Sequence, residues 1–477
     1  MKYAYTAAQI RAAEAAEMAR LAHRALMQRA AIGLAEFLVR RLHDRHGFTQ
    51  GGQLLLIVGP GFNGGDALFA GVRLLKRGIQ VLAWRFTDRV YEAGWEAFIA
   101  AGGREVGDTE AWTAAQRVDI VVDGGFGIGG RPGLTGKLAD FAPVLERAND
   151  VVAVDLPSGL DADAAQHVQP CLRADATVTF GAYKICQLTD PVDGLCGDVE
   201  LISIGLSLSS RDAAVAALDR TDLQHVWPQP GPHSDKYSRG VVGIDTGSDD
   251  YPGAAVLSTL GAVYSGAGMV RFLGAPRALD LVLHRLPNVV AAAGRVQAYL
   301  FGSGWGQRPD GRPVIESALA TGVPAVIDAD GLNHLPAELS GCLLTPHAGE
   351  LARLLRTTRA EVEADPIGHV RRAATDLGVT VLLKGAVQYV AAPGTECVRI
   401  AIPGPAWTAQ AGSGDTLAGV AATLLAGGLT PIEAALGAAS LQALTAAAHP
   451  GPHPPQDLAL QFPAMIAELT GGPHRAR

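Results

Sequence analysis

Closely spaced glycines mark the clearest candidate for a nucleotide-binding loop. The segment GPGFNGG (59–65) carries Gly59, Gly61 and Gly64, which match the spacing G-x-G-x-x-G. Glycines there would let the backbone approach a pyrophosphate, while the N-terminus of the following helix supplies N–H donors. The alternative is a tight strand–helix turn without a ligand. A dehydrogenase would carry an acidic residue after the second strand, where this chain has Arg85 instead.

Polar residues follow two further apolar runs in the first half of the chain. Asp123 ends VDIVVD, Asp155 ends VVAVD, and Ser158 lies three residues beyond Asp155. The carboxyl ends of parallel strands meet at one edge of an α/β sheet, so these residues should lie near the glycine loop. Oxygen atoms of Asn63, Asp123 and Ser158 suit a hard cation, and Asp155 is placed to act as a general acid or base. Each Asp alone is equally well explained as a helix cap or turn residue.

The most informative stretch of the second half is AGSGD (411–415). It places Gly412, Ser413 and Gly414 before Asp415 at the start of a helical pattern. Successive N–H groups at such a position form an anion hole for a phosphoryl group in transfer. Asp415 would then take a proton from the attacking hydroxyl. The alternative is a capped helix start without chemistry.

Further strand ends of the second half carry polar side chains. His347 follows CLLTP, where it would hydrogen-bond a substrate or be an ordinary loop residue. Lys384 follows TVLL and suits a nucleotide phosphate. Asp328 and Asp330 in VIDADGLNHL suit Mg²⁺ bound through water, or a purely structural role.

Alternating apolar runs and helical patterns must position these loops. The three- and four-residue apolar spacing of residues 1–47 predicts a helix. Short apolar runs predict strands at 53–58, 79–86, 118–123, 151–156, 176–181 and 199–204. Strands that alternate with helices favour the α/β class, with a mostly parallel sheet covered on both faces.

A proline-rich segment separates the two halves. At 477 residues the chain should form two or three domains. Residues 207–239 interrupt the alternation and hold Pro228, Pro230 and Pro232, which predicts two α/β domains, 1–220 and 221–477. The second predicts strands at 241–247, 269–274, 298–304, 324–330, 342–347, 380–385 and 387–393, and closing helices at 414–426 and 431–447.

The composition excludes several classes of protein. With 48% hydrophobic and 18% charged residues, the chain has material for large cores, and global disorder is ruled out. A net charge of −8 argues against a chain that binds nucleic acid over a broad face. Five cysteines without C-x-x-C spacing argue against a disulfide framework or a thiolate zinc site, and we expect a cytoplasmic protein.

Neither apolar segment that could suggest a membrane has the right pattern. Glu14 and Glu17 interrupt the N-terminal segment where a signal peptide needs an apolar run. Residues 251–270 carry no charge but contain Pro252 and four glycines, which favours a buried loop–helix segment over a membrane span.

Three motifs of the first half carry a family resemblance. GPGFNGGDAL, DGGFGIGGRPGLTG and VAVDLPSGLDAD resemble, in this order, the signature loops of the NAD(P)H-hydrate epimerase domain, over most of residues 1–220. The resemblance implies a Rossmann-like three-layer αβα domain that interconverts the R and S epimers, at C6, of hydrated NADH and NADPH (NADHX and NADPHX). It implies Asp155 as the catalytic or substrate-contacting carboxylate and Asn63, Asp123 and Ser158 as ligands of K⁺. The implied substrate contacts are Phe62, Asn63, Gly64, Gly65, Asp66, Gly127, Ile128, Gly129, Gly130, Arg131, Pro132, Gly133 and Asp155.

This chain departs from that family's pattern in one loop. The family commonly has Asn where Phe62 stands and Gly where Ala67 stands, which puts the efficiency of epimerisation in question. The segment TFGAYK also resembles a family segment around a lysine. Lys184 is therefore a further pocket candidate, with an ordinary surface lysine as the alternative.

Five ordered motifs of the second half carry another resemblance. The residues HSDKYSRGVVGIDTGSDDYPGAAVLSTLGAVYSGAGMVR, DADGLN, LTPHAGE, LLKG and AGSGD resemble the ADP-dependent NAD(P)H-hydrate dehydratases, of ribokinase-like αβα fold, over about residues 225–470. The resemblance implies Mg²⁺, ADP as co-substrate and Asp415 as the catalytic residue. It implies contacts to the hydrate from Ala255, Gly304, His347 and Asp415, and to the nucleotide from Lys384, Gly385, Ala386, Val387, Gln388 and Gly414. Thr is common where this chain has Gln388 and Gln410, so the preference for ADP over ATP is less secure than the reaction class.

Together the resemblances predict a bifunctional repair enzyme. One domain would epimerise the hydrate and the other would dehydrate its S form, consuming ADP and giving AMP and phosphate. We expect small-molecule substrates, a homo-oligomer, and no nucleic-acid or membrane partner. The rivals are a ribokinase-like small-molecule kinase, which would release a stable phosphorylated product, and an N-terminal module that binds nucleotides or a partner without turnover.

Overall fold

The structure is a computed structural model that describes residues 1–22, 24–165, 169–189 and 194–471. Contacts divide the chain into two compact units. We call Tyr3–Val215 the N-terminal unit, and Met1–Lys2 together with Ala216–Arg477 the C-terminal unit. Each unit has a hydrophobic core of its own.

A parallel sheet forms the centre of the N-terminal unit. In spatial order its described strands are β4 (Arg104–Glu105), β3 (Gln80–Arg85), β2 (Gln53–Val58), β5 (Ile120–Gly124), β6 (Val151–Val154), β7 (Ala176–Phe180) and β9 (Asp198–Ile202). The central strands are buried and mostly apolar because helices cover both faces of the sheet. The six strands predicted from the sequence are confirmed, and β4 is an addition too short to show a pattern.

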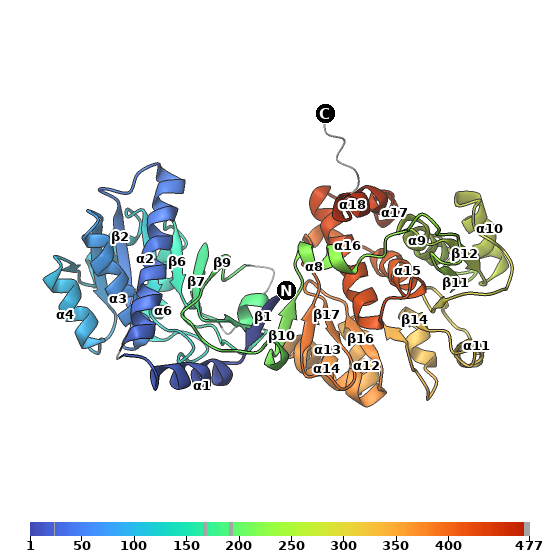
Figure 1. Ribbon diagram of the computed structural model, residues 1–477, viewed down its shortest axis with the longest axis horizontal. Helices are drawn as coiled ribbons and strands as arrows, with labels where there is room; N and C mark the ends of the chain where they lie inside the picture. The colour runs from blue at the N-terminus through green and yellow to red at the C-terminus, as the bar shows by residue number, and fades with distance from the viewer. Residues whose placement is uncertain (23, 166–168, 190–193, 472–477) are drawn as a thin grey trace. The chain divides into compact units, whose positions relative to one another are not determined.

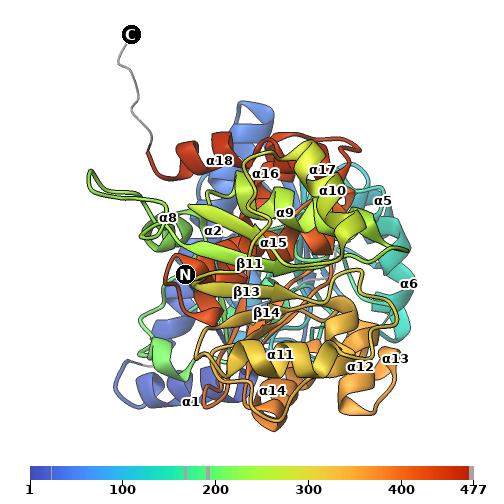
Figure 2. The same ribbon diagram turned by 90° about the vertical axis from the view of Figure 1, so that its right-hand side faces the viewer.

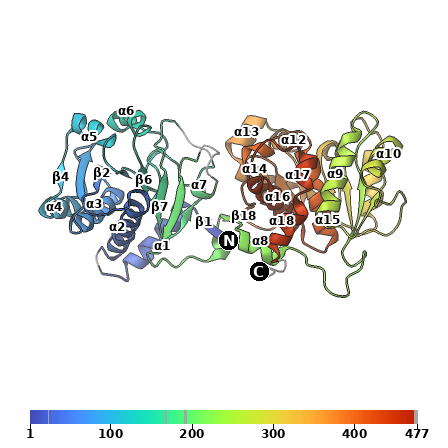
Figure 3. The same cartoon turned by 90° about the horizontal axis from the view of Figure 1, so that it is seen from above.

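Helices lie on both faces of this sheet. Figure 3 shows α2 and α3 on one side of the strands and α5 and α6 on the other. Two clusters of buried side chains fill the two interfaces. The helices are α1 (Ala7–Met18), α2 (Ala25–His46), α3 (Phe62–Leu75), α4 (Glu92–Ala100), α5 (Asp108–Ala115), α6 (Gly136–Leu145) and α7 (Ile185–Leu188), with a 3₁₀ turn at Ser210–Asp212.

The prediction of one helix over residues 1–47 is wrong in detail. The chain begins with β1 (Lys2–Tyr5), which runs parallel to β8 (Tyr183–Lys184). Thr6 then caps α1, since its hydroxyl accepts from the backbone N–H of Gln9 and its own backbone N–H donates to the side-chain oxygen of Gln9. Residues 19–24, of which residue 23 lies outside the described part, separate α1 from α2.

Glycines hold two of the predicted loops against each other. A Cβ on Gly59 would lie 1.7 Å from the carbonyl oxygen of Gly125, and one on Gly64 would lie 2.2 Å from that of Gly59. No side chain fits at either position. The turn that leads into α3 therefore depends on glycine for packing as well as for any approach to a ligand.

The sheet of the C-terminal unit is parallel with an antiparallel margin. The order of its strands is β12 (Met269–Phe272), β11 (Val241–Asp245), β13 (Ala298–Phe301), β14 (Ala325–Ile327), β15 (Leu343–Leu344), β16 (Thr380–Leu383), β17 (Tyr389–Ala391) and β18 (Val398–Ile400). Neighbours from β12 to β16 are parallel, and β17 pairs antiparallel with β16 and β18. The predicted strands are confirmed, whereas β18 was not predicted.

Two helical layers cover this sheet as well. Figures 1 and 2 show α9 and α15 on one side of β11, β13 and β14, and α11, α12 and α14 on the other. The elements are β10 (Val215–Ala217), α8 (Arg220–Val226), α9 (Pro252–Tyr264), α10 (Pro276–Arg285), α11 (Gly311–Leu319), α12 (Ala348–Leu355), α13 (Arg359–Ala364), α14 (Pro366–Leu377), α15 (Ser413–Ala426), α16 (Pro431–Ala448), α17 (Pro455–Ala459) and α18 (Phe462–Leu469), with 3₁₀ turns at Ala329–His334 and Ala406–Thr408.

Two sequence predictions about helices meet the structure here. The predicted helices 414–426 and 431–447 are confirmed as α15 and α16, but α17 and α18 follow them, so they do not close the chain. Residues 251–270 hold α9, much of which is buried inside the unit. Across the described residues, every helix is too short or too polar to cross a membrane.

Two candidate active sites

Asp155 lies at the carboxyl end of β6 in a conformation that is uncommon for a residue with a side chain. Its φ is +69°, and its N–H donates to the carbonyl of Val178 at 2.8 Å. A left-handed aspartate at a strand end costs conformational energy, and such residues concentrate at functional sites. The backbone thus turns at the position where the sequence predicts the catalytic carboxylate.

A buried lysine pairs with Asp155. The Lys184 ammonium is 1% exposed and forms an ion pair with Oδ1 of Asp155. It also donates to the hydroxyl of Thr179 at 2.7 Å. The alternative of an ordinary surface lysine is therefore wrong, and β8 brings Lys184 into the same site as Asp155.

Two of the three predicted cation ligands, Asp123 and Ser158, bond to each other, and the third, Asn63, lies in the first turn of α3. The Ser158 hydroxyl donates to Oδ1 of Asp123 at 2.7 Å, and its N–H donates to Oδ2 at 2.7 Å. Asn63 donates its amide N–H to the carbonyl of Val154 at 2.8 Å, which leaves its Oδ1 free to accept. Burial raises the pKa of Asp123, against the hydrogen bonds from Ser158 and Gly125. An all-oxygen set with a buried carboxylate fits a hard cation.

The glycine loop after β5 borders both groups of residues. A Cβ on Gly127 would lie 3.1 Å from Oδ1 of Asn63 and 3.2 Å from Oδ2 of Asp155. Gly130 donates to the carbonyl of Gly127 at 2.8 Å, and Gly133 donates to that of Gly159 at 2.9 Å. The predicted substrate loop is thus anchored to the Asp155 loop. Its segment Gly129–Pro132 is mostly exposed, with Gly130 half-buried.

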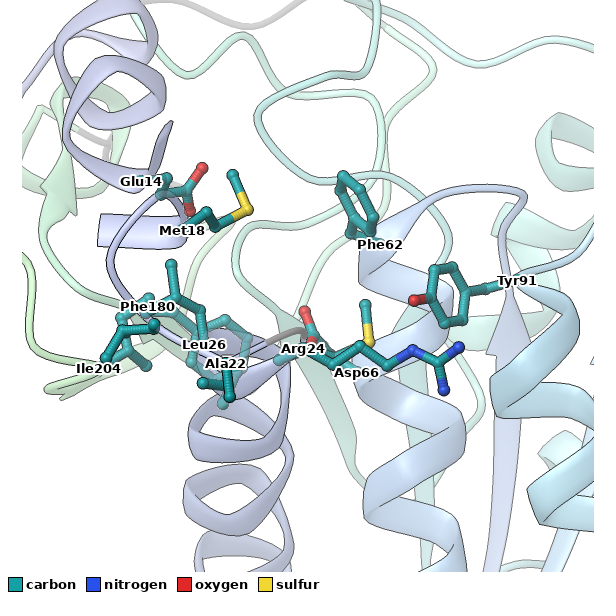
Figure 4. Close-up of a pocket in the computed structure, with 14 residues that line it drawn as sticks. Glu14, Met18, Ala22, Arg24, Leu26, Phe62, Asp66, Tyr91, Phe180 and Ile204 are labelled. Carbon is teal, nitrogen blue, oxygen red and sulfur yellow. The ribbon is translucent and has the colours of Figure 1, made fainter. Parts of the chain in front are cut away.

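A cavity of about 230 Å³ lies in this unit, and its wall includes Phe180, whose N–H donates to Oδ1 of Asp155 at 3.4 Å. Phe62, 68% exposed, lies at it with its ring centroid 5.9 Å from that of Tyr91, and Asp66 belongs to its wall (Figure 4). Burial raises the pKa of Asp66 well above its usual value, and the charges of Asp155 and Glu14 add to this. The remaining lining residues include several apolar side chains: Met18, Leu21, Ala22, Ala25, Leu26, Met27, Ala30, Phe180 and Ile204, besides Arg24.

Of the lining residues of this cavity, sequence reasoning found only Phe62 and Asp66, and it missed the polar side chains of Glu14 and Tyr91. Glu14 lies on α1 and Tyr91 precedes α4, so neither belongs to a strand-end motif. The only signal for Glu14 is an acidic residue within an alanine-rich helix. Burial raises the pKa of Glu14, as does the charge of Asp155.

In the C-terminal unit, Asp415 lies in the first turn of α15. Burial raises its pKa to about 7, the charge of Asp328 adds to this, and Lys384 and the Ser303 hydroxyl act in the opposite direction. A carboxylate with such a pKa is matched to accepting a proton near neutral pH.

A second lysine–aspartate pair, of which the aspartate is buried, lies beside Asp415. Lys384 is 2.6 Å from Oδ1 of Asp328, which is 1% exposed. Asp328 also accepts from the hydroxyls of Thr345 at 2.8 Å and Ser303 at 3.1 Å. Its carboxylate thus accepts from three described side chains, and the choice between Mg²⁺ bound through water and a structural role stays a prediction. Asp330 accepts from the N–H of Gly306 at 2.8 Å.

The predicted anion hole needs one correction. The N–H of Ser413 donates to the carbonyl of Gln410 at 3.2 Å, so it is not available to a phosphoryl group. The first turn of α15 still offers the N–H groups of Gly414 and Asp415. A Cβ on Gly414 would lie 3.2 Å from the Lys384 ammonium, which places this lysine next to the helix start.

The other predicted residues of this unit divide into three groups. His347 caps α12, its Nδ1 accepting from Gly349 at 3.0 Å, and its backbone bridges to that of Lys384. Gly304, with φ of +66°, lies against the backbone of Tyr251, whereas Ala255 is fully buried. Of the predicted nucleotide segment, Gly385 and Ala386 are exposed, Val387 and Gln388 are half-buried, and the buried Oε1 of Gln388 has no hydrogen-bond partner within the described residues.

Comparisons with known proteins agree with the division into units. Residues 242–462 match the family described as NAD(P)H-hydrate dehydratase, and residues 23–186 match that described as YjeF-related protein N-terminus. A bifunctional NAD(P)H-hydrate repair enzyme of Mycobacterium leprae is 43% identical over 471 residues, covering 95% of this chain and 96% of that protein. The chain belongs to the bifunctional NAD(P)H-hydrate repair enzymes.

More distant members of this family, and a solved structure, extend the comparison. A bifunctional NAD(P)H-hydrate repair enzyme of Escherichia coli is 31% identical over 448 residues, covering 88% of this chain and 84% of that protein. The crystal structure of an ADP/ATP-dependent NAD(P)H-hydrate dehydratase from Bacillus subtilis, co-crystallized with ATP/Mg²⁺, superposes with a TM-score of 0.50 at 24% identity, covering 54% of this chain and 99% of that one. The predicted fold class, two α/β domains of αβα layers with a ribokinase-like second one, is confirmed.

Proposed function

We propose that this repair enzyme epimerises hydrated NADH and NADPH in its N-terminal domain and dehydrates the S epimer in its C-terminal domain. We assign residues 1–220 to the first activity and 221–477 to the second. The observation that supports this most is the presence of two separate sites, Asp155 with Lys184 and Asp415 beside Lys384, in a chain that matches bifunctional relatives over nearly its whole length.

In the epimerase site, Asp155 would exchange a proton with the C6 hydroxyl. Lys184 fixes the carboxylate, and the strand-end conformation of Asp155 turns it toward the glycine loop. The substrate would be held by the residues predicted for it, Phe62–Asp66 and Gly127–Gly133. K⁺, held by Asn63, Asp123 and Ser158, would supply positive charge for the oxygen atoms of the substrate. We expect epimerisation to be faster in K⁺ than in equimolar Na⁺, measured as the rate of R-to-S exchange.

In the dehydratase site, a hydroxyl is converted into a better leaving group. Asp415 accepts the proton of the C6 hydroxyl while the oxygen of that hydroxyl attacks the β-phosphorus of ADP. The bond from the β-phosphorus to AMP breaks, and AMP departs. The N–H groups of Gly414 and Asp415 would stabilise the phosphoryl group in transfer. Phosphate then leaves C6, assisted by the ring nitrogen, and loss of a proton from C5 restores the reduced nicotinamide.

The remaining predicted residues would bind the two substrates of this domain. Gly304 and His347, with Ala255 behind them, would border the hydrate, and Lys384–Gln388 with Gly414 would border the nucleotide. Mg²⁺ would arrive with the nucleotide phosphates and neutralise part of their charge. We also propose that the enzyme acts in the cytoplasm on these small molecules, as a homo-oligomer that light scattering would reveal.

Purified R and S hydrates, each incubated with and without ADP and Mg²⁺, test this function. We expect the absorbance of reduced nicotinamide to return completely from either epimer when ADP is present. If it returns from neither, the dehydratase assignment fails. If the absorbance returns quickly from the S epimer, but from the R epimer no faster than spontaneous epimerisation allows, the epimerase assignment fails. A stable phosphorylated product would instead support the rival small-molecule kinase.

A further inference from the structure

The cavity of the N-terminal unit contains an acidic group that the proposed chemistry has not used. Asp66 lies on α3, is 8% exposed and contributes to the cavity wall, yet its buried Oδ1 has no hydrogen-bond partner among the described residues. A buried carboxylate without a partner is costly, because neither water nor a donor compensates its charge. A protonated carboxyl group avoids most of that cost and can donate a hydrogen bond or a proton.

The charges around Asp66 favour the protonated form. Three carboxyl groups, of Glu14, Asp66 and Asp155, act on one another here. The positive charges of Lys184 and Arg11 oppose the rise at Glu14, and Lys184 is paired with Asp155. Arg24 and Tyr91 are the other polar side chains of the cavity wall. Figure 4 shows Glu14, Phe62, Asp66 and Tyr91 around the same space. Asp155 and Asp66 therefore stand in opposite situations: Asp155 is held in an ion pair, whereas the buried Oδ1 of Asp66 has no partner in the part of the chain that the structure describes.

We propose that Asp66 is the proton donor of the epimerase site and works with the Asp155 carboxylate on opposite atoms of the substrate's hemiaminal group. The inference rests on the proposed function and adds a second catalytic residue to it. Two carboxyl groups whose surroundings differ in this way are the usual means of placing an acid and a base in one site.

The assignment yields a step in which all atoms and electrons balance. Asp155 accepts the proton of the C6 hydroxyl, the C6–N1 bond breaks, and C6 becomes an aldehyde. The electron pair passes to N1, which takes the proton of Asp66. After rotation about the C5–C6 bond, N1 attacks the other face of the aldehyde, returns its proton to Asp66, and the new C6 oxygen takes the proton from Asp155. Both residues are restored, so no other reactant is needed.

Asp66→Asn is the direct test, because an amide keeps the shape of a protonated carboxyl group but cannot give up a proton in this way. Without ADP the dehydratase is idle, so chromatography of the R and S hydrates reports epimerisation alone. We expect kcat for exchange to fall by about 100-fold or more, while KM changes by less than about threefold. Asp140→Asn, at an exposed position of α6, is the matched control and should keep the wild-type rate. An Asp66→Asn enzyme with more than about a tenth of the wild-type kcat would overturn the inference.

The pH profile supplies a second test that does not depend on how well Asp66→Asn folds. A proton donor must be protonated, so the wild-type rate should fall as pH rises through its pKa. The charge of Glu14 raises the pKa of Asp66, so Glu14→Gln should move this alkaline limb to lower pH. The proposal would be contradicted if Glu14→Gln left the pH of the alkaline limb unchanged. It would also be contradicted if the same limb persisted in the residual activity of a folded Asp66→Asn enzyme.

The two levels of hypothesis fail differently. If the wild-type chain does not exchange the epimers at all, the proposed epimerase function is wrong. If the wild-type chain exchanges them and Asp66→Asn does so equally well, with the near-UV circular dichroism of the folded protein, only the role of Asp66 is wrong.

Discussion

Each of the two sites contains a lysine–aspartate pair with a buried aspartate, but the two pairs differ in the role of that aspartate. In the N-terminal unit the lysine partner is the predicted catalytic residue itself, since Lys184 pairs with Asp155. In the C-terminal unit the partner is Asp328, a supporting residue, and the predicted catalytic Asp415 lies outside the pair. Pairing holds a carboxylate in place, whereas exclusion from the pair leaves burial free to raise its pKa toward neutrality.

This difference suits the two reactions. Dehydration needs a base that takes up one hydroxyl proton near neutral pH, and Asp415 has a pKa of about 7. Epimerisation must return every proton it moves, which calls for a base and an acid in fixed positions. The N-terminal unit provides a fixed carboxylate at Asp155 and a separate carboxyl group at Asp66, whose buried Oδ1 has no partner among the described residues.

Removal of the Asp415 carboxylate, which lies outside the lysine–aspartate pair, should have the largest effect on activity. We expect Asp415→Asn to lower ADP-dependent dehydration of the S hydrate by about 1,000-fold, because the amide cannot accept the hydroxyl proton. Epimerisation without ADP should be unchanged, and Asp280→Asn, at an exposed position of α10, should leave both activities intact. A folded Asp415→Asn enzyme with wild-type dehydratase activity would remove Asp415 from its role.

Removal of Lys184 or Lys384 should distinguish the two pairs by whether catalysis recovers when the partner aspartate is also replaced. Lys184→Met and Lys384→Met each leave a buried aspartate uncompensated, which costs about 3–5 kcal/mol of stability in the unit concerned. The double variants Lys184→Met/Asp155→Asn and Lys384→Met/Asp328→Asn should regain much of that stability in urea unfolding. Only the second should regain measurable catalysis, since it still contains Asp415. Equal recovery of both activities would show that the two pairs serve the same purpose.

The pH dependence of dehydration follows from the pKa of Asp415. Because the base must be ionised, kcat/KM for the S hydrate should rise with pH, with a midpoint at about 7. The positive charge of Lys384 lowers this pKa, so Lys384→Met should move the midpoint to higher pH. A folded-state pKa above the unfolded one also means that Asp415 contributes stability at acidic pH that is lost as pH rises through about 7, and Asp415→Asn should abolish this part of the slope. Identical midpoints in both enzymes would exclude Asp415 as the titrating base.

The smallest effect on activity should come from a methyl group added at Gly127, beside the Asp155 carboxylate. Gly127→Ala places a Cβ 3.1–3.2 Å from Oδ1 of Asn63 and Oδ2 of Asp155, so these side chains must shift slightly. We expect a loss of about threefold to tenfold in epimerase kcat/KM, of the order of 1 kcal/mol. Gly129→Ala, whose Cβ would meet nothing within 4 Å, should have no effect. Equal losses in the two variants would mean that loop flexibility, not contact with the carboxylate, matters there.

Much of the fold could be predicted because its signals are local. The apolar run at 53–58 stops at Gly59, and the same pattern marks most other strands of both sheets. The early division into β1 and α1 also had a local signal, the T-x-x-Q capping box of Thr6 and Gln9, which the apolar spacing obscured. The break before α2 has no glycine or proline to mark it, and the short β4 and β18 depend on tertiary pairing.

The sites could be predicted only as far as strand ends and motifs reach. Asp155, Asp415 and the glycine loops follow apolar runs or precede helices, so their positions could be predicted from the sequence. The pairing of Lys184 with Asp155 joins residues 29 positions apart, and Glu14 reaches the cavity from a helix with no motif. The protonation state of a side chain is still harder to predict from the sequence. The pKa of Asp66, for example, depends on burial and on charges that only folding brings near it.

The backbone contact between Gly59 and Gly125 has a kinetic consequence. Because no Cβ fits between the two loops, we expect them to move together and the epimerase site to be formed before the substrate arrives. Such a site loses little loop entropy on binding. Association of the hydrate should therefore proceed in a single phase whose rate increases in proportion to substrate concentration, without the plateau that a slow rearrangement of these loops would impose.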